Sequence, residues 1–362
     1  MDYYALLVAL VLLTAVLMRG NQQGNKKYVI VASLLLFAIY GLRDTYHIGF
    51  DSATSYLYGF KRIGAQPWSE IFANSSRYNF GFTLMTKAFH FFISTDYQLY
   101  ITTISVFVSI CFGRLIYKYS PSPVQSILYH FGLLLYVFHF SALKQSIAMA
   151  FLMLAFDAII ERKPVKFFLL VFIASQFHFP ALVFLPAYFL PKLKIERYFL
   201  IALAVMLVLT YLFRNQIITF MLSMYKDENI TAVDLSNIRF LRTKALIMIV
   251  IVVAAILLRM PGPDDPVYTL LMKCIGVAIV FQTFCGYNNI FERLADYYFQ
   301  FSVIFIPMAF DRNVPRRSML SRRFVVLVDT LAPYAFCSFA IYRFLSYTST
   351  SSGFHPYRFF FS

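Results

Sequence analysis

The stretch SALKQSIAMAFLMLAFDAIIERKPVKFFLLVFIASQFHFPALVFLPAYFL, residues 141–190, decides the fold class. It holds one long apolar run before the basic turn ERKPVK (161–166) and two shorter runs after it. Apolar runs of this kind satisfy their backbone groups in lipid only as helices. Pro180 prevents one helix from continuing between the two shorter runs. The stretch therefore predicts membrane helices, the last two forming a broken helical hairpin with His178 at its tip.

The rest of the chain extends this pattern. Of its 362 residues, 60% are hydrophobic and only 14% are charged, which is typical of an all-α polytopic membrane protein. We expect about twelve membrane spans within a single integral-membrane domain, residues 1–362. The apolar segments lie at roughly 3–18, 28–42, 97–117, 124–139, 142–160, 165–178, 180–191, 197–214, 243–258, 267–286, 290–310 and 324–346.

Short basic loops predict the orientation, because such loops stay in the cytoplasm. The clearest is DRNVPRRSMLSRR, with five arginines against one acid. The apolar segment 79–92 contains Lys87 and His90, and counting it as a span would put ERKPVK on the wrong side. We therefore expect a re-entrant or interfacial helix there, and both termini on the outer face. The predicted cytoplasmic loops are 19–27, 161–166, 191–197 and 311–323, and the long outer loops are 43–96 and 214–244.

With this orientation, unusual polar side chains from separate parts of the sequence gather at the outer boundary. Several cations there suit a di-anionic group such as a lipid pyrophosphate. An acid or a histidine nearby could deprotonate an attacking hydroxyl, and Asp51, Glu292 and His178 are the candidates. No HExxH or DxD motif is present, so we expect no metal and no cofactor. The other members are Arg43, Asp44, Lys144, Arg239, Arg242 and Arg293.

Structural roles are open for several of these residues. Arg43 and Lys144 could be interfacial anchors whose charged ends reach the head groups. Asp51 could be the N-cap of a helix that begins SATSYLYGF. His178 could be a core histidine bonded to a carbonyl. Arg293 could have no role beyond neutralising Asp296, which lies three residues away on the same helical face.

Four stretches also carry a family resemblance. They are GLRDTYHIGFDSATSY (41–56), NFGFTLMTKAF (79–89), the stretch 141–190 and FERLADYYFQFSVIFIP (291–307). In this order they resemble the EpsG-like branch of the Wzy family of bacterial polysaccharide polymerases. Two positions depart from the family pattern: Lys144 stands where an arginine is usual, and Asn79 stands where an acid is common.

The resemblance implies a GT-C-like helical bundle in the bacterial inner membrane, with its active site facing the periplasm or exterior. Such an enzyme moves a growing glycan from undecaprenyl pyrophosphate onto a lipid-linked repeat unit, making O-antigen, capsule or exopolysaccharide. Arg43, Lys144 and Arg293 are then the pyrophosphate ligands, and Tyr297 joins Asp44, Arg239 and Arg242 as a supporting residue. A chain-length co-polymerase is the expected partner. The alternatives are a flippase of lipid-linked oligosaccharide, which the broken hairpin favours, and an O-antigen ligase.

Overall fold

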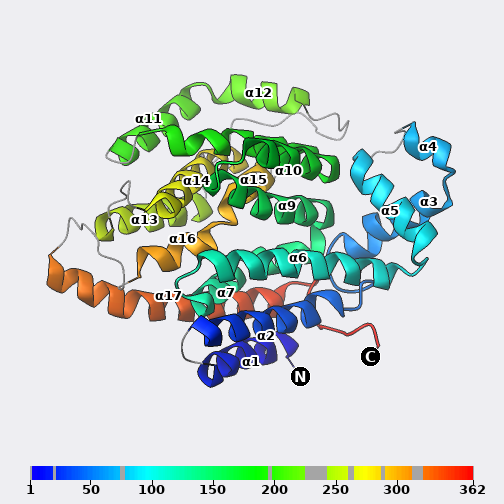
Figure 1. Ribbon diagram of the computed structural model, residues 1–362, viewed down its shortest axis with the longest axis horizontal. Coiled ribbons are helices and arrows are strands. Elements are labelled where there is room, and N and C mark those ends of the chain that lie inside the picture. Colours follow the sequence, from blue (N-terminus) through cyan, green and yellow to red (C-terminus); the bar gives the residue numbers. More distant parts are fainter. Residues whose placement is uncertain are drawn as a thin grey trace. The chain divides into compact units, whose positions relative to one another are not determined.

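The computed structural model describes residues 2–18, 22–73, 78–194, 198–224, 243–259, 265–286, 290–311 and 321–361, most of which lie in helices (Figure 1). The first helices are α1 (Tyr3–Leu17), α2 (Gln22–Gly41), η1 (Ser52–Tyr56), α3 (Leu57–Ala65), α4 (Trp68–Phe72), α5 (Phe80–Phe92), α6 (Tyr97–Tyr119), α7 (Pro123–Gly132), α8 (Leu135–Ser141), α9 (Leu143–Ile160) and α10 (Pro164–Phe177). They are followed by η2 (Phe179–Lys192), α11 (Phe199–Leu212), α12 (Arg214–Met224), α13 (Thr243–Leu258), α14 (Pro266–Gln282), η4 (Thr283–Gly286), α15 (Ile290–Phe299), α16 (Ser302–Ala309) and α17 (Arg322–Thr350).

The chain folds into two compact units. The first unit comprises Met1–Leu185 together with Leu331–Ser362, and the second comprises Pro186–Thr330. Within the second unit, α14 packs against α13, α15 and α16. The single membrane domain predicted for residues 1–362 depends on how the two units pack, and it stays a prediction.

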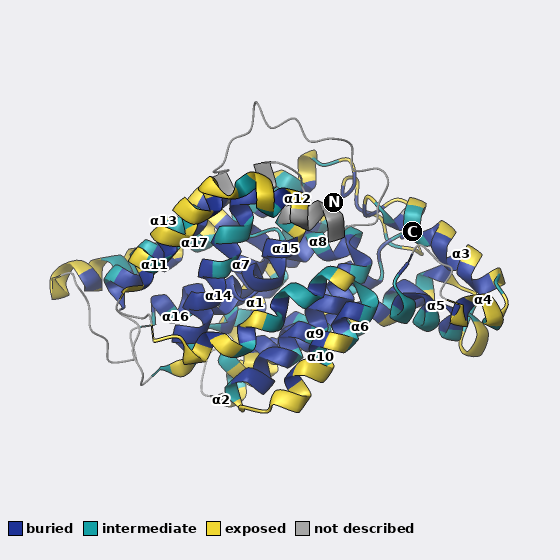
Figure 2. Cartoon of the chain, turned by 90° about the horizontal axis from the view of Figure 1, so that it is seen from above, coloured by how far each residue is buried: buried dark blue, intermediate teal, exposed yellow. Residues whose placement is uncertain are grey.

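Helix α9 is the centre of the first unit. It packs against α6, α8 and α10, while α2 packs on α6 and α1 packs on α2. Most of α9 is buried, as the dark blue of Figure 2 shows. Small side chains at Ala148, Ala150 and Ala155 are fully buried and let neighbouring backbones approach closely. Lys144 lies in the first turn of this helix and Asp157 lies near its end, so the two are separated by roughly 20 Å along its axis.

The structure confirms a helical membrane protein but does not support the predicted count of about twelve spans. Among the described residues, three helices are long and apolar enough to cross a membrane, α6, α9 and α17, and the pair α7 and α8, bent by 55°, can count as a fourth. The predicted span 290–310 is divided into α15 and α16. Most other predicted spans form apolar helices of 10–17 residues, shorter than the roughly 20 residues that a span requires.

The broken hairpin after the basic turn is present, in a tighter form than expected. Helix α10 ends at Phe177, His178 is extended, and η2 follows as a 3₁₀ helix of 14 residues. The rings of Phe167 and Phe184 lie 6.2 Å apart, so the first half of η2 turns back toward α10. A 3₁₀ helix rises about 2.0 Å per residue, so η2 extends over roughly 28 Å.

The segment predicted to be re-entrant forms α5, a helix of 13 residues. The ammonium of Lys87 is buried and donates to the Gly64 carbonyl at 2.8 Å, near the end of α3. A cation at this position stabilises the exposed carbonyls at a helix C-terminus. Lys87 therefore fastens α5 to α3, whereas the position of α5 in the membrane stays a prediction.

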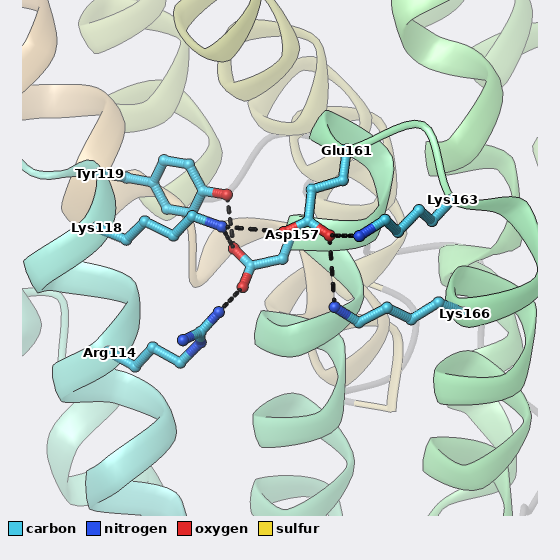
Figure 3. Close-up of polar contacts among 7 residues, drawn as sticks. All are labelled: Arg114, Lys118, Tyr119, Asp157, Glu161, Lys163 and Lys166. Carbon is cyan, nitrogen blue, oxygen red and sulfur yellow. Dashed lines mark hydrogen bonds and ion pairs between the residues drawn. The ribbon is translucent and has the colours of Figure 1, made fainter.

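A charged cluster ties together α6, α9 and α10 at the end of the first unit that the loop charges predict to be cytoplasmic (Figure 3). The buried Asp157 carboxylate accepts from the Tyr119 hydroxyl at 2.6 Å, lies 3.0 Å from the Lys118 ammonium, and also pairs with Arg114. Glu161 lies within 4 Å of three ammonium groups, those of Lys118, Lys163 and Lys166. The Lys163 ammonium holds the pKa of the Glu161 carboxyl below its ordinary value, and Lys118 and Lys166 act in the same direction.

Replacing Asp157 with asparagine is expected to lower the free energy of unfolding by about 1–3 kcal/mol, because the buried negative charge that pairs with Arg114 and Lys118 is lost and only one of its two acceptor oxygens remains. The matched control is Glu161→Gln, whose carboxylate is more exposed and screened by water, and we expect a much smaller loss there. Denaturation of the two purified variants in detergent measures the difference. Equal losses would contradict the structural role of Asp157.

Candidate active site

The loop after α2 is held by the C-terminal tail of the chain. Arg43 and Phe359 form an isolated antiparallel bridge. The Asp44 amide donates to the Arg358 carbonyl at 2.8 Å, and the Phe360 amide donates to the Leu42 carbonyl at 3.0 Å. Backbone hydrogen bonds on both sides of the bridge fix its register. The loop after α2 and the C-terminal tail therefore form one paired segment at this end of the first unit.

Arg43 points inward from this segment. Only 1% of the residue is exposed, and its Nε and Nη2 atoms donate to the carbonyls of Ile48 at 3.3 Å and Phe140 at 3.1 Å. Nη1 donates to the Tyr40 carbonyl. The guanidinium carbon also lies 4.9 Å from the ring centroids of both Tyr40 and Phe140. In this conformation the guanidinium joins three backbone segments, which points to a positioning role. Pyrophosphate binding by Arg43 stays a prediction.

Gly49 supplies the sharp turn that the Gly-x-Asp sequence requires. Its φ is +102°, which favours glycine, and an added Cβ would lie 2.4 Å from the Phe140 carbonyl oxygen. The Gly49 amide donates to the Gly353 carbonyl at 2.8 Å, so the tail holds this turn as well. The turn places Asp51 immediately before the first turn of η1.

Asp51 occupies the N-cap position predicted from the sequence but makes no capping bond. The helix it precedes begins as η1, a single π-helical turn, and continues as α3. Among the described residues, the Asp51 side chain makes no cap hydrogen bond, and it is half-buried. Short π-helical turns occur frequently at functional sites. The Asp44 carboxylate, in contrast, accepts from the Tyr46 amide at 2.9 Å and pairs with His47.

Lys144 and His178 lie at the same end of the first unit. Lys144 is in the first turn of α9, and its ammonium lies 4.9 Å from the centroid of the Tyr78 ring. The Phe50 amide donates to the Ser141 hydroxyl at 3.0 Å, which brings the residue before Asp51 to the end of α8, three residues from Lys144. His178 ends α10, which packs against α5, the helix that follows Tyr78. Arg43, Asp44, Asp51, Lys144 and His178 therefore share one end of a helical bundle.

The remaining predicted residues belong to the second unit or lie outside the described residues. Glu292 is half-buried, Arg293 is exposed and Tyr297 is fully buried, all three on α15. Arg239 and Arg242 lie outside the described residues, as does most of the outer loop 214–244. Of the predicted site residues, the structure therefore brings five to one end of the first unit: Arg43, Asp44, Asp51, Lys144 and His178.

The sequence-based prediction missed the tail. The stretch GFHPYRFFFS (353–362) holds none of the predicted spans, loops or site residues. In the structure Tyr357 is buried, and its hydroxyl donates to the Ile39 carbonyl at 2.8 Å. Its ring also packs on Tyr3 and Tyr4 of α1. The aromatic density of the tail was the available signal, because aromatic side chains seldom cluster in an unpacked terminus.

The fold and this polar end define an α-helical membrane protein that places acidic and basic side chains at one end of its bundle. The chain belongs to the EpsG family, whose family model matches residues 26–359. The match includes both partners of the bridge between Arg43 and Phe359. No curated protein and no solved structure matches the chain.

Proposed function

We propose that this protein is a polysaccharide polymerase, a glycosyltransferase that joins lipid-linked oligosaccharide repeat units at the outer face of the bacterial inner membrane. The donor is a glycan on undecaprenyl pyrophosphate, and the acceptor is the non-reducing-end hydroxyl of the next lipid-linked unit. The observation that carries this proposal is membership of the EpsG family over residues 26–359. The assembled polar end of the first unit supports it.

In the proposed reaction Asp51 accepts the proton of the acceptor hydroxyl as that oxygen attacks the anomeric carbon. The bond between this carbon and the pyrophosphate oxygen breaks, and the pyrophosphate leaves with its charge. Lys144, half-buried at the start of α9, is the proposed cation for this leaving group in the first unit. His178 is the alternative base or a phosphate ligand. Glu292, Arg293 and metal independence enter the proposal as predictions from the sequence, and a chain-length partner enters it on the family resemblance alone.

Asp51→Asn is expected to lower polymer formation at least about 100-fold, because a positioned general base contributes roughly 10²–10⁴-fold. Stability should stay unchanged, since the side chain makes no capping bond among the described residues. Asp96→Asn and Asp96→Ala are the matched controls, because Asp96 caps α6 through the amides of Gln98 and Leu99. The alanine control should lower the thermal midpoint and retain activity in the folded fraction. An Asp51→Asn protein with wild-type polymer output would exclude the base assignment.

The alternative function is transport of the lipid-linked oligosaccharide. The break between α10 and η2 and the bend of 55° between α7 and α8 favour it, because transporters use broken helices around their substrates. Purified protein in vesicles containing lipid-linked repeat units separates the possibilities by product. A ladder of long glycans on a gel supports the polymerase. Movement of the lipid across the bilayer without bond formation supports the transporter, and transfer of one glycan to a different acceptor supports a ligase.

A further inference from the structure

Helix α10 is apolar on two opposite faces. The face that includes Phe167 and Val171 is buried, because α10 packs against α9 and α5. The residues of the opposite face are between 39% and 80% exposed, and they are Val165, Phe168, Leu169 and Phe172. They recur every three or four positions, so they lie on one side of the helix. An apolar helix with such an outer face requires hydrocarbon around it, which a lipid bilayer supplies.

The first turn of α10 is open to an anion. Its N-cap residue, Lys163, makes no side-chain capping bond among the described residues, and Pro164 follows it. The amides of Val165 and Lys166 have no acceptor within the helix, as is general for a first turn. A helix N-terminus carries a partial positive charge, and phosphate groups are typical ligands of it. The exposed apolar face begins in this same turn, at Val165.

Cations gather around this helix terminus. The side chains of Lys163 and Lys166 are 62% and 45% exposed, and both contact Glu161 (Figure 3). Arg162 is exposed and makes no ion pair among the described residues. With Arg162, the charged cluster of Figure 3 holds five cations and two carboxylates, an excess of three positive charges. This excess attracts an anionic ligand.

Arg162 occupies a backbone position that favours glycine. Its φ is +54°, and it follows the end of α9. The Arg162 amide donates to the Ile159 carbonyl at 3.1 Å, and the Lys163 amide donates to the Ala158 carbonyl at 2.9 Å. These two bonds form a Schellman motif, in which the left-handed residue is usually glycine. A strained arginine in place of glycine indicates a use for its charge, which here lies beside the first turn of α10.

We propose that the beginning of α10 binds the phosphate of an anionic phospholipid from the surrounding bilayer. The phosphate lies at the helix N-terminus among Arg162, Lys163 and Lys166, and the acyl chains lie along the exposed apolar face. The loop charges predict that this end of the first unit is cytoplasmic, where anionic lipids give the membrane a negative surface. A free phosphate ion or a soluble acidic protein would leave the apolar face uncovered. An anionic lipid matches both the charge and the apolar face, and its binding does not depend on the proposed polymerase reaction.

Native mass spectrometry of the purified protein measures this binding. The affinity for phosphatidylglycerol should be at least about 5-fold higher than that for phosphatidylcholine with the same acyl chains. Lys166→Ala should lower the affinity for phosphatidylglycerol about 5-fold, because one cation near an anionic head group contributes roughly this factor. Lys61→Ala is the matched control, because Lys61 is exposed on α3, and it should change neither affinity. Equal affinities of the wild type for the two lipids would overturn the proposal.

Two further arms separate the phosphate from the acyl chains. Glycerol phosphate has the charged group without the chains and should not displace the lipid at equal concentration. Displacement would identify a site for free phosphate and overturn the lipid proposal. Leu169→Asn, in the middle of the exposed face, should weaken the binding of both lipids alike, because it places a polar amide against the acyl chains. An unchanged affinity would exclude the apolar face from the site.

Glu161→Gln and Arg162→Gly should change the binding in opposite directions. The first variant removes the carboxylate that Lys118, Lys163 and Lys166 contact, so the affinity for phosphatidylglycerol should rise several-fold. Arg162→Gly relieves the strained φ, so its thermal midpoint should rise while the affinity falls about 5-fold. A purely structural role of these cations would change the affinity in neither variant. If Glu161→Gln binds no more lipid than the wild type, the lysines serve only to neutralise Glu161, and the proposal is overturned.

Discussion

Replacing Arg43 with alanine is expected to abolish polymer formation and to lower the free energy of unfolding by at least about 3 kcal/mol. The guanidinium is the shared donor of three backbone carbonyls, those of Tyr40, Ile48 and Phe140. Without it these buried acceptors have no charged donor, and the loop that carries Gly49 and Asp51 loses one of its links to α8. The loss of contact with two aromatic rings adds to the effect.

Arg43→Lys distinguishes a positioning role from direct binding of the substrate. Lysine keeps the charge, but a single ammonium cannot donate in the three directions of the planar guanidinium. If Arg43 positions the loop, the lysine variant should resemble alanine in both stability and activity. Arg62→Ala is the control, because Arg62 is exposed at the end of α3 and its loss should change neither quantity. Polymer ladders and denaturation in detergent measure the two effects. A stable Arg43→Ala protein with only a raised KM would instead identify Arg43 as a substrate ligand.

Local sequence patterns predicted the helices and breaks that depend on neighbouring residues in the sequence. The apolar runs correctly placed α1, α6, α9 and α10, since helices in lipid depend on continuous hydrophobicity. Pro180 marked the break at His178, and the small polar run after Asp51 marked the beginning of a helix. The loop charges distinguished the two ends of α9. In the structure Lys144 lies at one end and the cluster around Asp157 lies at the other.

Features that depend on contacts between distant parts of the chain could not be predicted in this way. The sequence Gly-Leu-Arg indicates that Arg43 lies at the end of a membrane helix. It does not indicate whether the Arg43 side chain points to solvent or into the protein, because that depends on the position of its acceptor, the Phe140 carbonyl. The pairing of Arg43 with Phe359 joins opposite ends of the chain through backbone atoms, which leave no residue signature. The predicted number of spans is not supported, because hydropathy does not reveal helix length when a run is divided by turns, as between α15 and α16.

Ending the chain after Thr350 is expected to reduce polymer formation about 100-fold without preventing membrane insertion, because α17 stays complete. The deletion removes three backbone hydrogen bonds to the loop, those between Asp44 and Arg358, Phe360 and Leu42, and Gly49 and Gly353. At about 1 kcal/mol each, their loss would lower the population of the ordered loop by roughly two orders of magnitude. The bond between the Tyr357 hydroxyl and the Ile39 carbonyl is lost as well.

Side-chain variants within the tail show whether its backbone or its arginine is required. Arg358→Ala keeps every backbone bond to the loop, and its side chain is exposed, so polymer output should stay near that of the wild type. Tyr357→Phe removes only the hydroxyl and should give a small loss of stability. If Arg358→Ala were as inactive as the deletion, the tail would contribute a substrate-binding cation instead of a backbone clamp. A deletion with normal polymer ladders at normal protein level would show that the loop after α2 holds its conformation without the tail.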